Sequence, residues 1–354
     1  MSCISLSTCL KCLILSAGLL VFQGVRAQEG FTDLDQQLIS RQKQLNKNYV
    51  VQVWKQGDTL IYQKLGGDLI ARAAVPMEHS SVWLTTALVM ILVDEGKISL
   101  DDKITRWLPE FEKYGKNYIT IRHCLTHMTG IKGDGPGIGK LFQKKKFSSL
   151  EEVVNSYAAR EIQSNPGTEF RYNSIGPDIA GRVLEVVTKK RFDQLIKQRL
   201  FTFLKMRSTS FSNVMGGAVS PSTGATSSAD DYTRFLVMLL NKGTYHGRRI
   251  LSEESVQEML KQQVDPSLMK DTPKGTEGFS YALGSWLVKT GTDGKNGGTV
   301  FINPGLPGAW PMIDTCRGYS YLYVVKEPSE EEKGGINLEL KALVDGHFTG
   351  NCGE

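Results

Sequence analysis

The residues of this chain with the greatest potential for chemistry lie together at the start of one apolar segment. His79, Ser80 and Ser81 directly precede a run of mostly apolar side chains. A serine hydroxyl becomes a nucleophile when a neighbouring base removes its proton. On a helix, that base must stand about one turn away, because such positions share a face. Trp83 and Leu84 occupy those positions for the two serines, so neither serine has a lysine beside it.

Other stretches match catalytic motifs in residue type and spacing, but they lack the structural context that the chemistry needs. A serine followed three residues later by a lysine occurs at 40–43 and at 267–270, but neither match opens a buried helix. A Lys-Thr-Gly triplet at 289–291 directly follows a predicted strand, and we interpret it as a strand end that enters a turn. His123 and His127 are four residues apart, but no nearby carboxylate completes a set of metal ligands. The sequence therefore predicts no metal site and no cofactor.

Length and composition are those of a secreted globular protein. Of the 354 residues, 40% are hydrophobic and 22% are charged, which allows a sizeable core. Residues 1–27 resemble a signal peptide, with Lys11, an apolar run too short to span a bilayer, and a cleavage position before Gln28. Without Lys11 and Arg26, the net charge of +5 falls to about +3. That excess is too small to indicate nucleic-acid binding, and we expect no membrane partner.

Three cysteines follow the predicted signal peptide. Cys124 lies in an apolar stretch and is predicted to be a small buried side chain. Cys316 and Cys352 both lie near the C-terminus in turn-like surroundings. Because exported proteins fold in an oxidising compartment, we expect a disulfide between these two cysteines.

The predicted elements place strands at both ends of the chain and helices in its middle. The helices expected from hydrophobic spacing are 33–47, 80–95, 175–187, 193–203 and 230–240. The expected strands are a hairpin of 49–54 and 59–62, then 281–288, 299–302 and 319–325. This order predicts one α/β (α+β) domain over 28–354. Its antiparallel sheet comes from both termini, and a helical lobe of about 97–205 is inserted between them.

Several collinear segments resemble the β-lactamase-like serine hydrolases, the family of class C β-lactamases and D-Ala-D-Ala carboxypeptidases (peptidase family S12). The matching segments are Trp83–Leu88, Val93–Asp102, Ile119–Gly130, Pro166–Tyr172, Gly176–Glu185, Ser228–Leu240 and Tyr281–Trp286. They cover residues from about 35 to 330 in the correct order. The resemblance implies a penicillin-binding-protein-like fold with a cleft between sheet and helices.

The resemblance also implies three catalytic elements, and each is altered here. Family members open the buried helix with Ser-x-x-Lys, but this chain has His79 and Val82 at those two positions. The Tyr-x-Asn element keeps Tyr172 and carries Ser174 in place of asparagine. The Lys-Thr-Gly or His-x-Gly element aligns with Asn303-Pro304-Gly305, which lacks the cationic or imidazole group. Degenerate positions at all three elements favour lost catalysis.

We therefore expect a secreted, catalytically inactive member of this family with a binding or structural role. The resemblance extends to the gigasin-type shell-matrix proteins of molluscs, which makes an extracellular matrix role the leading hypothesis. A matrix protein, a polysaccharide or a peptide could occupy the vestigial cleft. The alternative is an active esterase, amidase or D-aminopeptidase with Ser80 or Ser81 as a rearranged nucleophile and Tyr172 as the base. A third hypothesis is a bacterial periplasmic protein that scavenges β-lactams or muropeptides by binding them without turnover.

Overall fold

The structure is a computed structural model, and it describes residues 30–133, 147–213, 216–288, 300–305, 308–327, 334–348 and 352. The predicted signal peptide and the Lys-Thr-Gly triplet at 289–291 lie outside the described residues. Within the described ranges, no helix combines the length and the apolar character needed to cross a membrane.

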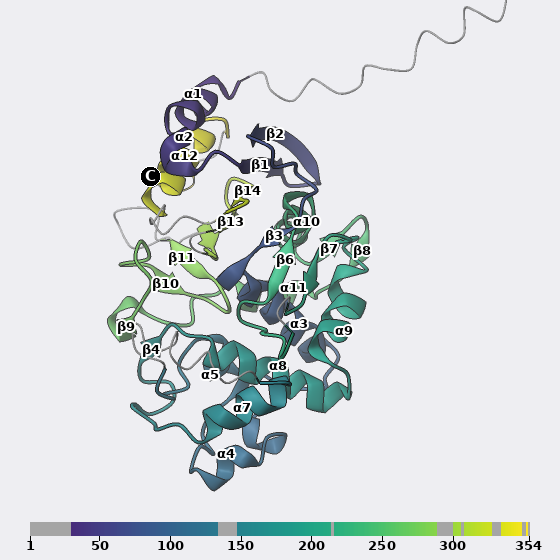
Figure 1. Cartoon of the computed structure of the whole chain (residues 1–354), viewed down its shortest axis with the longest axis vertical. Coiled ribbons are helices and arrows are strands. Elements are labelled where there is room, and N and C mark those ends of the chain that lie inside the picture. Colours follow the sequence, from purple (N-terminus) through teal and green to yellow (C-terminus); the bar gives the residue numbers. More distant parts are fainter. Residues whose placement is uncertain are drawn as a thin grey trace, which may run out of the picture.

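Seven antiparallel strands form the main sheet (Figure 1). In spatial order they are β10 (Ser280–Tyr281), β11 (Trp286–Val288), β12 (Val300–Ile302), β13 (Ala309–Asp314), β14 (Tyr319–Val325), β1 (Tyr49–Lys55) and β2 (Thr59–Gly66). The N-terminal β1 pairs with the C-terminal β14, with Val51 opposite Tyr323. The structure thus confirms an antiparallel sheet that is assembled from both ends of the chain.

The sheet separates two hydrophobic cores, because successive side chains of a strand point to opposite faces. Val50 belongs to one core, and its neighbour Val51 belongs to the other. The helices α1 (Thr32–Ser40), α2 (Gln42–Leu45) and α12 (Gly334–Asp345) cover one face, and α10 (Ala229–Leu240) packs on the other (Figure 1). A disulfide joins Cys316, in the turn after β13, to Cys352 beyond α12. Cys124 is a free thiol with no exposed surface.

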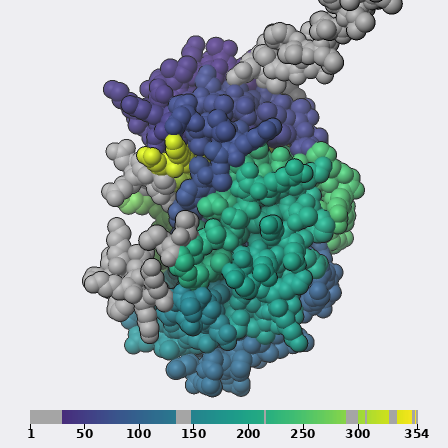
Figure 2. Space-filling model, turned by 45° about the vertical axis from the view of Figure 1, so that its right-hand side comes forward, coloured from purple at the N-terminus to yellow at the C-terminus, as the bar shows by residue number. Residues whose placement is uncertain are grey.

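The helical part of the molecule surrounds α3 (Ser81–Asp94), in which every side chain from Ser81 to Leu92 is buried. The remaining helical elements are η1 (Glu78–Ser80), η2 (Ile104–Arg106), α4 (Glu110–Lys113), α5 (Ile121–Leu125), α7 (Leu150–Ala158), α8 (Ile175–Thr188), α9 (Phe192–Ile196), the π-helical turn η3 (Lys197–Phe201), α11 (Glu253–Met259) and η4 (Pro266–Leu268). The purple N-terminal residues lie above this part in the space-filling view, and the teal helical residues form a continuous surface below them (Figure 2).

Three small sheets connect the helical part to the main sheet. They contain β3 (Val75–Pro76), β6 (Ala225–Ser227) and β5 (Ser210–Phe211); β4 (Phe170–Arg171) and β9 (Met269–Asp271); and β7 (Thr244–Tyr245) and β8 (Arg248–Arg249). The β4–β9 pair is parallel and joins a segment inside the helical lobe to one beyond it. These small sheets therefore fix where the ends of the helices meet the strands.

Three predictions about elements were wrong in detail. The expected single strand 281–288 is a tight hairpin of β10 and β11, because Gly284 adopts φ = 72° and reverses the chain. The expected helix 33–47 breaks into α1 and α2 around Arg41. The expected helix 193–203 is the α9 helix followed by a π-helical turn. The sequence reading also missed β13 and α12.

Candidate functional site

The turn that leads into α3 has a rare backbone conformation. Glu78 has φ = 46°, in the left-handed region that residues other than glycine seldom adopt. The backbone N–H of Met77 donates to the carbonyl of Ala225 at 2.9 Å, so β6 anchors the chain just before the turn. After this turn, His79 borders a cavity, whereas Val82 is completely buried. An apolar side chain therefore occupies the position that the resemblance predicts for the lysine.

Ser80 and Ser81 both have completely buried side chains whose hydroxyls bond to the backbone. The Ser80 hydroxyl donates to the carbonyl of Asn303 at 2.6 Å. The Ser81 hydroxyl donates to the carbonyl of Glu78 at 2.6 Å and accepts from the N–H of Ala225 at 3.0 Å. A nucleophile must be accessible and must have a base as its hydrogen-bond partner. The geometry therefore opposes the use of either serine as a rearranged nucleophile.

Tyr172 follows β4, and its ring lies beside that of His79 with 5.2 Å between the ring centroids. The Tyr172 hydroxyl is buried and has no hydrogen-bond partner among the described residues. Burial raises the pKa of this phenol well above its usual range, so the group stays protonated near neutral pH. Ser174, two residues later, is the N-cap of α8 but makes no capping hydrogen bond. Of the two residues at this element, Tyr172 is therefore the one that borders the cavity.

Asn303 and Gly305 follow β12 and lie against the start of α3. The Asn303 side-chain amide donates to the carbonyl of His79 at 3.3 Å, and its side-chain oxygen is buried without a partner among the described residues. A Cβ atom on Gly305 would lie 1.9 Å from the carbonyl oxygen of Met77, so only glycine fits. Residues from the three segments that the resemblance singled out, namely His79, Tyr172 and Pro304, thus line one cleft.

The cleft is a cavity of about 160 Å³ with mostly apolar walls. The residues that line it are His79, Tyr172, Pro273, Thr276, Trp286 and Pro304. The sequence predicted His79 and Tyr172 as site residues and included Pro304 within an altered element. It did not predict Pro273, Thr276 and Trp286, because these residues come from the β9–β10 loop and from β11. Trp286 lay within the matching segment Tyr281–Trp286, which was the one available signal.

His127 lies beneath the cleft and was not anticipated as part of it. Its ring contacts that of Tyr172 with 4.4 Å between centroids, and its Nε2 lies 3.0 Å from the hydroxyl of Tyr281. Its Nδ1 accepts the N–H of Asn173 at 3.5 Å, which places the ring proton on Nε2. Burial lowers the pKa of His127 to about 3 and that of His79 to about 4, so both rings are neutral near pH 7.

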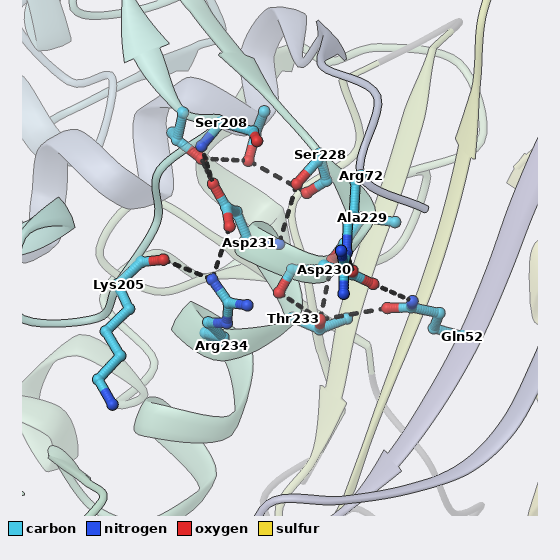
Figure 3. A network of polar contacts seen from close by, with 12 residues as sticks. Gln52, Arg72, Lys205, Ser208, Ser228, Ala229, Asp230, Asp231, Thr233 and Arg234 are labelled. Atoms are coloured by element: carbon cyan, nitrogen blue, oxygen red, sulfur yellow. Dashed lines mark hydrogen bonds and ion pairs between the residues drawn. The ribbon is translucent and has the colours of Figure 1, made fainter. Parts of the chain in front are cut away.

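Residues at the start of α10 form a second polar site, which contacts the turn before α3. The hydroxyl of Tyr232 donates to the carbonyl of Ser80 at 2.8 Å. The neighbouring carboxylate of Asp231 accepts from the N–H of Ser208 at 2.6 Å, from Thr209 at 3.0 Å and from Arg234 at 2.7 Å (Figure 3). These contacts hold the start of α10 in place, because buried charge is stable only when it is paired and hydrogen-bonded.

The described residues of the cleft therefore offer the neutral rings of His79 and Tyr172, with the side-chain amide of Asn303 bonded to the backbone of His79, and neither Ser80 nor Ser81 is paired with a base. The carboxylate of Glu78 is half-buried, and burial raises its pKa. Among the described residues, no group of three histidines, cysteines or acidic residues could hold a metal ion. The arrangement can bind a ligand by packing and by hydrogen bonds.

Comparison with known proteins gives a match to the family described as "Beta-lactamase" over residues 83–345. The match begins at Trp83, so the substituted residues 79–82 lie just outside it. An uncharacterised protein of Mycobacterium tuberculosis is 27% identical, and the alignment covers 84% of this chain and 89% of that protein.

Solved structures show the same fold. A protein from Bacteroides dorei with a provisional beta-lactamase name is 25% identical, with a TM-score of 0.76 over 89% of this chain and 98% of that one. An octameric penicillin-binding protein homologue from Pyrococcus abyssi is 18% identical, with a TM-score of 0.71 over 89% of this chain and 77% of that one. Because the family match spans most of the sequence, this chain belongs to the beta-lactamase family.

Proposed function

We propose that this chain is a secreted, catalytically inactive member of the beta-lactamase family that binds a ligand in its cleft without turning it over. One observation carries the proposal: the hydroxyls of Ser80 and Ser81 are buried and donate to backbone carbonyls. It joins the expectation, from the family resemblance, that His79 and Val82 stand at the nucleophile and lysine positions. Loss of an activated nucleophile removes several orders of magnitude from the rate of such enzymes.

Covalent labelling tests the lack of catalysis. Mature protein would be incubated with a fluorescent penicillin and with a fluorophosphonate, and its intact mass would then be measured. We expect the unmodified mass with both reagents, and heat-denatured protein serves as the control for non-specific labelling. An adduct that maps to Ser80, Ser81 or His79 would establish the alternative, an active hydrolase with a rearranged nucleophile.

Secretion is the second part of the proposal. The Cys316–Cys352 disulfide supports it, because such bonds persist in oxidising compartments. The test is to express the full chain in cells with a secretory pathway and to sequence the N-terminus of protein in the medium. We expect it to begin at Gln28. A chain that stays inside the cell with an intact N-terminus contradicts this part.

The extracellular matrix role rests on the resemblance to shell-matrix members of the family. Among the functions of an inactive secreted domain, a structural or binding role in a matrix needs no catalysis. Sequential extraction of the source tissue, with antibody detection, tests this role. We expect the protein in the insoluble extracellular fraction, and its confinement to the soluble fluid opposes the matrix role.

A further inference from the structure

The cleft has the size and the walls of a site for one flat ring. Its volume of about 160 Å³ is close to that of a cavity that holds one benzene molecule, about 150 Å³. Trp286 and Tyr172 contribute aromatic faces, with 5.5 Å between their ring centroids. Pro273 and Pro304 add two further apolar rings to the wall. Aromatic groups gain much of their binding energy by burying such faces.

Two of the residues that line this space carry buried polar atoms. The Tyr172 hydroxyl and Nδ1 of His79 make no hydrogen bond within the described part of the chain, although the side chain of Trp286 lies close enough to the hydroxyl to lower its pKa. The rings that carry these two atoms are neighbours, with 5.2 Å between their centroids. A ligand hydroxyl can donate one hydrogen bond and accept others. One hydroxyl therefore matches a corner made from a phenol and a neutral imidazole.

The described residues that line the cleft carry no charge near neutral pH. His79 is neutral, because burial lowers its pKa to about 4, and the other five lining residues are a tyrosine, a threonine, a tryptophan and two prolines. A buried carboxylate without a cation loses its hydration and gains no ion pair. Nearby charges do not select for an anion either, since the exposed Lys274 and the half-buried Glu78 have opposite signs. The lining residues therefore disfavour the carboxylate ligands that a cationic cleft would attract.

A sugar ring is the other neutral ring that carries hydroxyls, and it fits less well. A pyranose would bring several hydroxyl groups into a space whose described walls are mostly apolar and offer few polar atoms. The remaining hydroxyls would be buried without partners, which costs free energy.

We propose that the cleft binds an uncharged aromatic ring with one hydroxyl group, a phenol, in preference to a carboxylate or a sugar. This proposal rests on the proposed function, because it assumes that the ligand is bound and not turned over. A phenol can be a small molecule or a tyrosine side chain on a peptide, and the chemistry that the cleft recognises is the same.

Matched probes test the class of ligand. Mature protein would be titrated by ligand-observed NMR with p-cresol, toluene, p-toluate and methyl glucoside. We expect p-cresol to bind about tenfold more tightly than toluene, which corresponds to one good hydrogen bond. We expect p-toluate and methyl glucoside to bind more weakly than toluene. If either of these two binds more tightly than p-cresol, the proposal is overturned.

Two variants and a control locate the binding in this cleft. Tyr172→Phe removes one oxygen and keeps the ring, so the affinity for p-cresol should fall by about fivefold to tenfold while that for toluene stays the same. His79→Phe should have a similar effect. Lys274→Gln should change neither affinity. Thermal unfolding of each variant verifies that it is folded, and unchanged p-cresol binding by folded Tyr172→Phe and His79→Phe would contradict the proposal.

Two further measurements separate the remaining outcomes. Tighter binding of N-acetyltyrosinamide than of p-cresol supports the proposal and assigns the phenol to a tyrosine side chain; the reverse supports it with a free phenol. A covalent adduct in the labelling experiment refutes the proposed function. An unmodified mass together with no preference for p-cresol refutes the phenol class alone and leaves the absence of catalysis intact.

Discussion

The start of α10 and the start of α3 both place polar groups in the protein interior, but they satisfy them differently. At α10, the carboxylate of Asp231 accepts hydrogen bonds from Ser208, Thr209 and Arg234 (Figure 3). At α3, His79 borders a cavity and its Nδ1 has no partner among the described residues. One region is a closed network, whereas the other leaves its hydrogen-bonding capacity open.

The two regions differ because a stable scaffold needs its buried polar groups paired, whereas a binding or catalytic site needs polar groups that are free to bond a ligand. The network at α10 holds Tyr232, whose hydroxyl supports the carbonyl of Ser80, so it contributes to the scaffold in any family member. An active site, by contrast, keeps polar groups free for a substrate. The cleft retains that open character at His79. An open polar group of this kind is what the proposed binding function requires.

We expect the largest change in the free energy of unfolding from a substitution in the closed network around Asp231. Asp231→Ala should lower the free energy of unfolding by about 3 kcal/mol, because it leaves a buried N–H and the Arg234 guanidinium without their acceptor. Urea unfolding measures the change. The control is Asp193→Ala, whose carboxylate pairs with Arg191 at the surface and should cost at most about 0.5 kcal/mol. Equal effects of the two substitutions would remove the contrast between network and surface.

The next effect is on the pH dependence of stability, and it comes from the cleft. The folded-state pKa of His79 is about 4, below the ordinary value of 6.5, so between these values the unfolded state binds more protons. The contribution of His79 to stability is complete above about pH 6.5 and is lost as pH falls toward 4. At pH 4, His79→Phe should therefore lose about 3 kcal/mol less stability than the native chain does relative to pH 7.

Other buried groups also titrate in this range, so the comparison with the variant is the informative measurement. His127 contributes in the same direction, with a pKa of about 3. Asp178 contributes in the opposite direction, because burial raises its pKa to about 6. Both are present in the native chain and in His79→Phe. Identical pH profiles of the two proteins would mean that His79 is solvated rather than buried.

Ser81 gives a smaller effect and tests whether its hydroxyl is structural. Ser81→Ala leaves the carbonyl of Glu78 and the N–H of Ala225 without this partner, so the free energy of unfolding should fall by about 1–2 kcal/mol. Chemical denaturation measures this change, and labelling by a fluorophosphonate should be absent both before and after the substitution. Labelling of the native chain that disappears in Ser81→Ala would instead identify a nucleophile.

The smallest predicted effect is the difference in stability cost between substitutions of two serines, each at the N-cap of a helix. The N-cap Ser228 of α10 accepts the N–H of Asp231, whereas the N-cap Ser174 of α8, next to the cleft, makes no capping bond. Ser228→Ala should cost about 1 kcal/mol and Ser174→Ala less than about 0.5 kcal/mol. Thermal unfolding of the two variants side by side is sufficient. A reversed order would show that Ser174 has a role that its backbone position does not explain.

Local sequence patterns predicted much of the scaffold. The alternation of β-branched and aromatic residues in β1 and β14, and the continuous apolar run of α3, each indicate an element by themselves. The hairpin of β10 and β11 was misread as one strand, because both halves are apolar and the turn depends on Gly284 alone. Trp286 therefore could not be placed at the cleft in advance, since its position depends on that turn.

The sequence by itself determined that the chain has an α/β fold in which both ends contribute strands to one sheet. Residue types and their spacing along the chain are sufficient for this, whereas the assignment of His79 and Val82 to the serine and lysine positions rests on the family resemblance. The tertiary structure alone decided that the hydroxyls of Ser80 and Ser81 face backbone carbonyls, that the ring of His127 contacts that of Tyr172, and that prolines from two loops line the cleft. Apart from the contact of Ser81 with Glu78, these contacts join segments that are far apart in the chain. Hydrogen-bond partners and burial, which set pKa and access, exist only after the chain has folded.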